Sequence, residues 1–89
     1  MNFSTRITEL LGIRYPILQA GMSWASSNAE LALAVSRAGA LGVIAAGPMY
    51  PDALRAAIRT VKEMTDKPFA VNVPLYNARA AAFLDIVQE

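Results

Sequence analysis

Apolar residues are arranged along this chain in two alternating patterns, short continuous runs and longer stretches spaced by three and four residues. The runs fall at 16–20, 41–46 and 69–73, and each is bounded by Gly or Pro or by both. A short continuous apolar run is typical of a strand buried on both faces, as in a parallel sheet. A stretch with helical spacing follows each run, so the sequence predicts three successive strand–helix units.

The first two helices are predicted from their capping residues. A short helix over 5–11 has Ser4 or Thr5 as its cap and ends at Gly12. After the polar loop 23–27, Ser27 and Glu30 have the spacing of a capping box. Gly39 should end this second helix in the left-handed conformation, which glycine enters without steric cost. Its predicted inner face consists of Leu31, Ala34, Val35 and Ala38.

The last two helices are predicted in the same way. Pro51 suits the first turn of a helix that should end near Thr65, before Pro68. Asn77 is the expected cap of the final helix. The predicted inner faces are Leu54, Ala57, Ile58 and Val61 in the third helix, and Ala80, Phe83, Leu84 and Val87 in the fourth.

Regular alternation of strands and helices predicts an α/β fold with a parallel sheet and right-handed crossovers. A doubly wound sheet is the alternative architecture, but the turn after the first strand, 19–24, lacks a GxGxxG phosphate motif. We therefore favour the N-terminal three βα units of a TIM (β/α)8 barrel. A whole barrel takes roughly 250 residues, so we expect residues 1–89 to form a partial barrel domain, the N-terminal portion of an enzyme fold.

Candidate site residues gather at the predicted carboxyl ends of the strands, where barrel active sites assemble. At the end of the first strand stand Gln19, Ala20, Gly21 and Met22, where small residues let a planar ligand approach the backbone and a thioether can pack on its ring. A tight turn with Met22 as core filler is the alternative. Asn72 ends the third strand, either as a ligand-pairing amide or as a structural residue pinning a neighbouring loop.

Further residues near these strand ends leave similar alternatives open. Gly47 after the second strand either permits close approach of a ligand or a neighbouring loop, or merely makes a turn. Trp24 and Tyr76, in the flanking loops, either cover a pocket or pack against further parts of the fold. Asp52, Glu63 and Asp66 are interpreted as solvated helix charges.

Composition narrows the function classes. The chain is 55% hydrophobic and 17% charged, an apolar excess that favours contact with more protein, either further barrel units or a homo-oligomer. A net charge of +1 without a basic cluster argues against nucleic acid. Neither Cys nor His occurs, so we expect no metal site, and thiolate and histidine catalysis are absent from these residues. No membrane span or secretory signal is recognised, which makes the cytoplasm the expected location.

Three blocks of the chain, 5–22, 30–42 and 65–75, resemble the nitronate monooxygenases, formerly called 2-nitropropane dioxygenases. They resemble the FMN-dependent enoyl-acyl-carrier-protein reductases equally well. The first block ends in Tyr15-Pro16-Ile17-Leu18-Gln19-Ala20-Gly21-Met22, and the third contains Phe69-Ala70-Val71-Asn72-Val73-Pro74. The blocks occur in the family's order and span nearly the whole chain.

The resemblance implies a TIM barrel that holds FMN non-covalently at the strand ends. It assigns flavin contacts to Ala20, Gly21 and Met22 in the first loop, and to Asn72 at the end of the third strand. Two positions depart from the family: Gly21 stands where many relatives have proline, and Ala70 stands where glycine is common. The phosphate-binding loops and the histidine proposed as catalytic base lie downstream in the family, so no catalytic residue is assigned here.

Three functions follow as hypotheses. The first is an FMN-dependent nitronate monooxygenase that oxidises an alkyl nitronate with O2. The second is a reductase that uses FMN to pass a hydride from NAD(P)H to an enoyl thioester. The third belongs to another class, a non-catalytic barrel fragment that acts only by association. These residues do not separate the first two, because the catalytic base and the substrate pocket lie downstream in the family.

Overall fold

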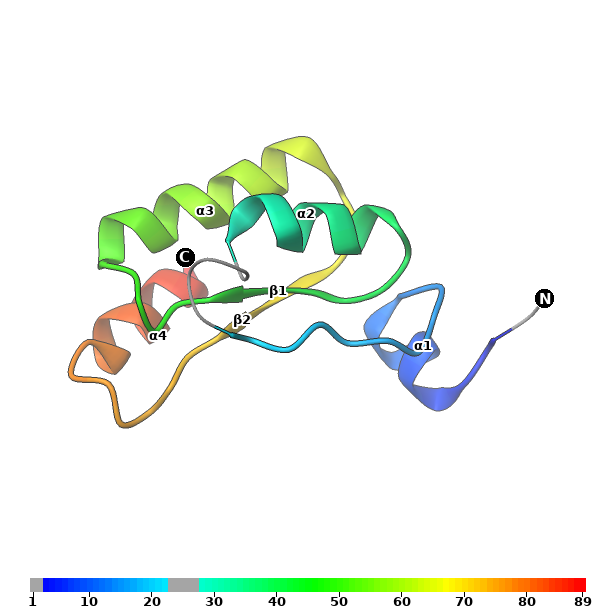
Figure 1. Ribbon diagram of the computed structural model, residues 1–89, viewed down its shortest axis with the longest axis horizontal. Helices are drawn as coiled ribbons and strands as arrows, with labels where there is room; N and C mark the ends of the chain where they lie inside the picture. The colour runs from blue at the N-terminus through cyan, green and yellow to red at the C-terminus, as the bar shows by residue number, and fades with distance from the viewer. Residues whose placement is uncertain (1–2, 23–27) are drawn as a thin grey trace.

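The computed structural model describes residues 3–22 and 28–89 and shows helices packed against a small parallel sheet (Figure 1). The elements are, in chain order, α1 Arg6–Leu11, α2 Ala29–Arg37, β1 Gly42–Ala45, α3 Pro51–Met64, β2 Phe69–Asn72 and α4 Ala80–Gln88. Helix α2 packs on β1 and beside α3, and α4 packs beside α3 on its other side. The described helices and strands therefore follow the predicted α/β order.

Strands β1 and β2 pair in parallel, with Gly42 opposite Phe69 and Ala45 opposite Asn72. The predicted first strand, 16–20, is shorter than expected and joins β1 only through a parallel bridge between Leu18 and Leu41. The Gln19 amide donates to the Leu41 carbonyl at 3.0 Å, and the Leu41 amide donates to the Ile17 carbonyl at 2.9 Å. The segment 17–19 thus lies along the edge of β1 that is opposite to β2.

The core lies between the helices and the sheet. Its buried members are Ala32, Ile44, Ala46, Leu54, Ala57, Val61, Phe83 and Ile86. All four residues of β1 are buried, as the continuous apolar run predicts for a central parallel strand. The predicted inner face of α3 is confirmed, with Leu54, Ala57 and Val61 buried and Ile58 packed against the core.

The predicted inner faces of α2 and α4 are partly wrong. In α2 the buried residues are Ala32 and Ser36, whereas Ala34 and Ala38 are exposed. The reason is Gly42, because a Cβ there would overlap the Ala32 carbonyl oxygen. The missing side chain lets the α2 backbone rest directly on β1, and small residues therefore occupy this interface.

In α4 the buried face contains Ala80, Phe83 and Ile86, while Leu84 and Val87 are exposed. Because α4 packs against α3 and contributes Phe83 and Ile86 to the core, its buried face is rotated toward Ile86, which the apolar spacing alone did not single out. The apolar side chains of Leu84 and Val87 lie at 43% and 45% exposure.

Most helix ends match the predictions. Thr5 caps α1 in a reciprocal capping box with Thr8, and Gly12 and Gly39 have positive φ angles of 69° and 103°. For α2 the N-cap is Asn28, whose side chain accepts from the Leu31 amide at 3.0 Å. The predicted cap, Ser27, lies outside the described residues.

Asn77 is not the cap of α4, since the helix begins three residues later with Arg79 as N-cap. The Asn77 side chain instead accepts from the Arg79 amide at 2.8 Å and donates to the Gly47 carbonyl at 3.0 Å. It therefore ties the loop after β2 to the loop after β1. Among the described residues, no helix is long and apolar enough to cross a membrane.

Candidate functional site

Gly21 and Asn72, two of the predicted site residues, are in direct contact. A Cβ placed on Gly21 would lie 2.6 Å from the Asn72 Cβ and 2.7 Å from its Cγ. Real Cβ atoms are not found this close to other carbons, so the Gly21 backbone packs on the Asn72 side chain only because Gly21 lacks one. The segment after residue 19 therefore passes the end of β1 and reaches the end of β2.

The Gln19 side chain explains how the chain leaves the sheet at this point. Leu41 and Val43 both face segment 17–19, and a continued parallel ladder would give the Val43 amide to a backbone carbonyl. Instead, the Val43 amide donates to Gln19 Oε1 at 3.0 Å. The side chain takes the place of the backbone acceptor, so the ladder ends here and residues 20–22 turn across the strand ends.

The Asn72 side chain is exposed, which corrects the expectation of an amide within a buried strand. Asn72 is the last residue of β2, and its carbonyl accepts from the Ala46 amide at 2.9 Å. Ala20 is also exposed, and Met22 is 48% exposed. The structure thus places the predicted residues together at the carboxyl ends of segment 17–19 and of β2, a surface that we call the rim. Gly21 and Asn72 are in contact there, and Ala20 and Met22 are exposed beside them.

Gly47 belongs to a structural link rather than to this contact. A Cβ on Gly47 would lie 3.0 Å from Pro74 Cγ, and the Gly47 carbonyl accepts from Asn77 and from Arg79 Nη2, the latter at 3.4 Å. These contacts all come from the segment after β2, so Gly47 permits the close approach of a neighbouring loop. Tyr76 is 94% exposed, and Trp24 lies outside the described residues.

Arg79 is a rim residue that sequence reasoning missed. Its Nε donates to the Met49 carbonyl at 3.2 Å, and its guanidinium lies 4.5 Å from the centre of the Tyr50 ring. A cation at the N-terminus of a helix interacts unfavourably with the helix dipole. The position of Arg79 at the start of α4 was therefore a signal in the sequence that this side chain makes other contacts. It joins the two loops that flank the site.

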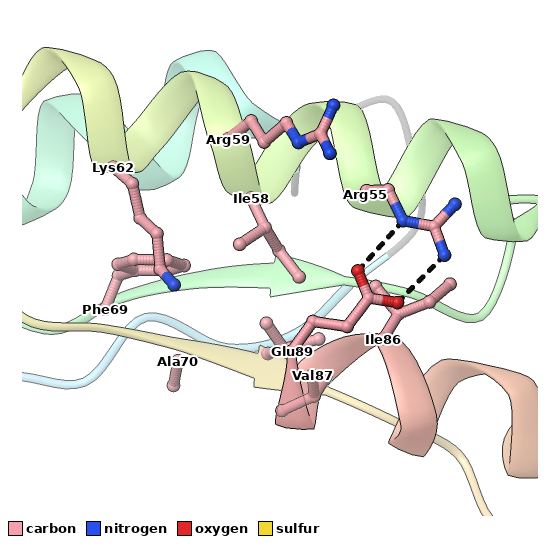
Figure 2. A pocket seen from close by; sticks show the side chains of 10 residues that line it. Arg55, Ile58, Arg59, Lys62, Phe69, Ala70, Ile86, Val87 and Glu89 are labelled. Atoms are coloured by element: carbon pink, nitrogen blue, oxygen red, sulfur yellow. Dashed lines mark hydrogen bonds and ion pairs between the residues drawn. The ribbon is translucent and has the colours of Figure 1, made fainter.

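A groove of about 540 Å³ lies elsewhere, between α3, β2 and α4 (Figure 2). Its floor is apolar and one wall is cationic; the lining side chains include Ile58, Arg59, Lys62, Phe69, Val71 and Val87. None of the predicted site residues lines it. The groove lies on the helix-covered side of β2, away from the rim where Gly21 meets Asn72.

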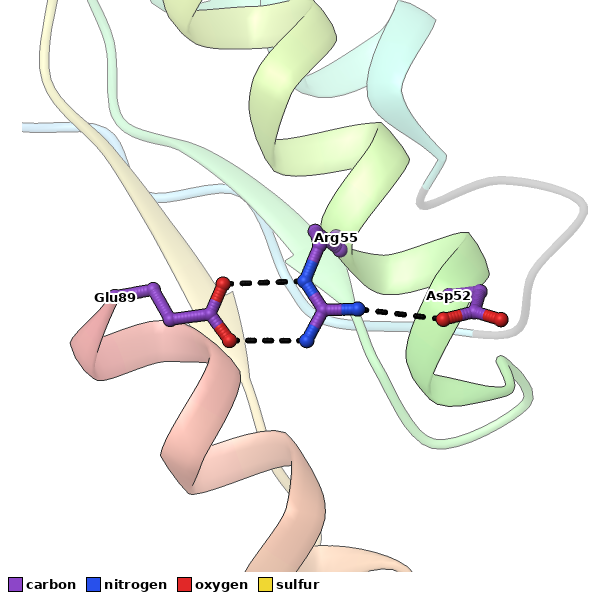
Figure 3. Close-up of polar contacts among 3 residues, drawn as sticks. All are labelled: Asp52, Arg55 and Glu89. Atoms are coloured by element: carbon purple, nitrogen blue, oxygen red, sulfur yellow. Dashed lines mark hydrogen bonds and ion pairs between the residues drawn. The ribbon is translucent and has the colours of Figure 1, made fainter.

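One end of this groove is closed by an ion pair. Arg55 donates to both carboxylate oxygens of Glu89, at 3.1 Å and 2.9 Å, and to Asp52 at 3.3 Å (Figure 3). The hydrogen bond from Arg55 lowers the pKa of the Glu89 carboxyl below its ordinary value, and the same bond raises the pKa of Arg55. This arrangement clips the end of α4 to α3.

Metal ligands are sparse in the part of the chain that the structure describes. The described residues contain no group of three or more Asp, Glu, His or Cys side chains that could hold an ion. What the rim offers is a glycine backbone, an exposed amide and an exposed thioether. These groups suit a flat heterocyclic ligand better than a cation.

Comparison with known proteins identifies the protein family to which the chain belongs. The sequence model of the nitronate monooxygenase family matches residues 4–88, and the chain belongs to this family. It is 46% identical over 89 aligned residues to the nitronate monooxygenase of Pseudomonas aeruginosa, covering 93% of this chain and 25% of that protein. It is 48% identical over 73 residues to an octahydroindene-carboxyl-CoA dehydrogenase of Mycobacterium tuberculosis, covering 82% of this chain and 20% of that protein.

The fold has a close match among solved structures. FabK from Thermotoga maritima superposes with a TM-score of 0.88 and 47% sequence identity over 93% of this chain, which corresponds to 26% of FabK. The chain therefore spans about a fifth to a quarter of the length of the relatives it matches. The resemblance noted from the sequence is confirmed at the level of the family.

Proposed function

We propose that the chain supplies the part of an FMN site that contacts the flavin ring, as the N-terminal three βα units of a TIM barrel. The contact between Gly21 and Asn72 carries this proposal. It joins the loop after segment 17–19 to the end of β2, on the rim where barrel ligands bind. Ala20 and Met22 lie beside it and are exposed.

The residues present fit a flavin. Gly21 leaves backbone open to a flat ring, Asn72 presents an exposed amide with both donors and an acceptor, and Met22 presents a polarisable thioether. When bound, FMN would supply the electron transfer that none of these side chains can perform. The chain's own residues position the ring, and none of them is assigned to proton transfer.

The reaction that the family membership supports best is the oxidation of an alkyl nitronate with O2, because two of the relatives are a nitronate monooxygenase and a probable one. The similarity to FabK keeps a second candidate, the FMN-dependent enoyl-acyl-carrier-protein reductase. The substrate would then be an enoyl thioester in place of a nitronate. The distinguishing groups are not among the residues at this rim.

Association with further protein is part of the same proposal. Strand β2 pairs with β1 on one edge only within the described sheet, and Ile17 and Leu18 are more than half exposed. Unpaired strand edges and apolar side chains of this kind favour further βα units or a second copy of the chain. If association were the only function, flavin binding would be absent.

Flavin absorbance tests the proposal directly. The chain is titrated with FMN and with riboflavin, and the visible absorbance of the ring is followed before and after desalting. We expect saturable, ring-perturbing binding, with similar affinities for both ligands because the family's phosphate-binding loops are not among these residues. Asn72→Leu should weaken binding and Thr60→Ala, on the exposed face of α3, should not. Unperturbed flavin spectra at all concentrations would contradict the proposal.

A further inference from the structure

The Gln19 side chain has one polar atom that the fold does not use. Oε1 accepts from the Val43 amide, but Nε2 is buried and has no hydrogen-bond partner among the described residues. The orientation of the carboxamide is fixed by this contact, since the reversed amide would place a donor against the Val43 N–H. Nε2 is therefore a committed donor without an acceptor.

A buried donor without an acceptor is unfavourable and calls for an explanation. Gln19 directly precedes the stretch 20–22 and lies where segment 17–19 leaves β1, next in sequence to the residues that line the rim. Gln19 needs only Oε1 to end the hydrogen-bond ladder between segment 17–19 and β1. The second half of the carboxamide is thus available for a ligand.

We propose that Gln19 is a flavin-binding residue, which donates from Nε2 to a carbonyl oxygen or ring nitrogen on the polar edge of the flavin. This inference rests on the proposed function. A flavin ring carries several such acceptors, and a neutral carboxamide pairs with them without introducing charge. Gln19 would act together with Asn72, which Gly21 contacts.

The substitution Gln19→Glu distinguishes the role of the Oε1 acceptor from that of the Nε2 donor. Glutamate keeps an oxygen for the Val43 amide, but replaces the Nε2 donor by an acceptor. The chain contains one other glutamine, Gln88, which is exposed near the end of α4 and serves as the matched control. We expect Gln19→Glu to weaken FMN and riboflavin binding by about tenfold or more, and Gln88→Glu to leave it unchanged.

Nuclear magnetic resonance of the unaltered ¹⁵N-labelled chain gives a readout that does not depend on how the variant folds. On addition of FMN, the side-chain NH2 signals of Gln19 should shift and those of Gln88 should not. If FMN binds but the Gln19 signals stay in place, or Gln19→Glu binds as tightly as the unaltered chain, the inference is wrong and the flavin site stands. If the unaltered chain binds no flavin, both the proposed flavin site and the role of Gln19 are contradicted.

Discussion

The Ser36 hydroxyl and the Gly42 amide are hydrogen bonded at 3.1 Å in the buried interface between α2 and β1. The same hydroxyl donates to the Pro68 carbonyl at 2.9 Å, at the entrance to β2. One side chain, 1% exposed, therefore holds a helix to both strands of the sheet.

Ser36→Ala should destabilise the chain by roughly 1–3 kcal/mol, because it removes the partner of a buried amide and of a carbonyl at once. Urea unfolding followed by far-ultraviolet circular dichroism measures the change. Thr60→Ala is the control, since the Thr60 hydroxyl is exposed and bonds only to Ala56 within its own helix. Equal stability of the two variants would contradict a bridging role for Ser36.

Gly42→Ala tests the close approach of α2 to β1. The added methyl would overlap the Ala32 carbonyl, so the helix must shift, and overpacking of this kind costs about 1–3 kcal/mol or more. Gly12→Ala is a useful comparison, because Gly12 has a positive φ but an added Cβ would make only an ordinary contact, with Pro68 Cγ at 4.0 Å. Its loss should be limited to the conformational term of about 1–2 kcal/mol. A Gly42→Ala chain as stable as the unaltered one would show that α2 lies farther from β1.

These small contacts explain where sequence interpretation succeeds and where it fails. The strands 41–46 and 69–73 and helix α3 follow from continuous apolar runs and a clear apolar face, and the structure confirms them. The face of α2 was predicted wrongly because Ser36 counts as polar, and its burial is decided by Gly42, which lies on another element, the strand that follows α2. Periodicity describes one element at a time and cannot report such pairs.

The candidate site likewise contains residues that the sequence predicted and contacts that it did not. Ala20, Gly21, Met22 and Asn72 were predicted from their place at strand ends and from the family resemblance, and the structure brings Gly21 and Asn72 together. Gln19 was named within the candidate stretch 19–22, but the role of its side chain was missed, and Arg79 was missed altogether, because each contact depends on a backbone group of another element. For the Gln19 side chain, the available signal was a glutamine near the end of an otherwise apolar strand.

Gly21→Ala should disturb the rim, because the new methyl would overlap the Asn72 side chain. We expect a loss of stability of about 1–3 kcal/mol, together with weaker flavin binding. Asn72→Gly in the same chain removes the overlapping atoms, so the double variant should recover stability but not flavin binding. Unfolding curves of the two single variants and the double variant measure this coupling. Additive losses would mean that the two residues are not in contact.

The Arg79–Tyr50 pair should hold the two rim loops together. Tyr50→Ala removes the ring beneath the guanidinium and should cost about 0.5–1 kcal/mol, the range for an exposed cation–π pair. Arg79→Met should cost more, since the bonds to the Met49 and Gly47 carbonyls are lost as well. Tyr76→Ala, in the same region but 94% exposed, is the control and should be neutral. A Tyr76→Ala effect as large as that of Tyr50→Ala would exclude a specific stacking contribution.

The ion pair between Arg55 and Glu89 should make the docking of α4 depend on pH. The hydrogen bond from Arg55 lowers the pKa of Glu89 in the folded chain, so the unfolded chain binds the proton more tightly. The pair's stabilisation is therefore fully present above the ordinary glutamate pKa of about 4.3. It is lost as the pH falls through the lower pKa of the folded state. Both side chains are partly exposed, so the effect should shrink in 1 M salt.

Glu89→Gln isolates this contribution, because it removes the titrating group and keeps the side-chain shape. The difference in unfolding free energy between the unaltered chain and Glu89→Gln should be constant near neutral pH and should vanish in acid. Glu63→Gln, which removes an exposed charge elsewhere on α3, controls for the change in net charge. Arg55→Met should abolish the pH dependence that Glu89 contributes. A Glu89→Gln difference that persists unchanged below the folded pKa would show that the bidentate contact does not hold α4 in solution.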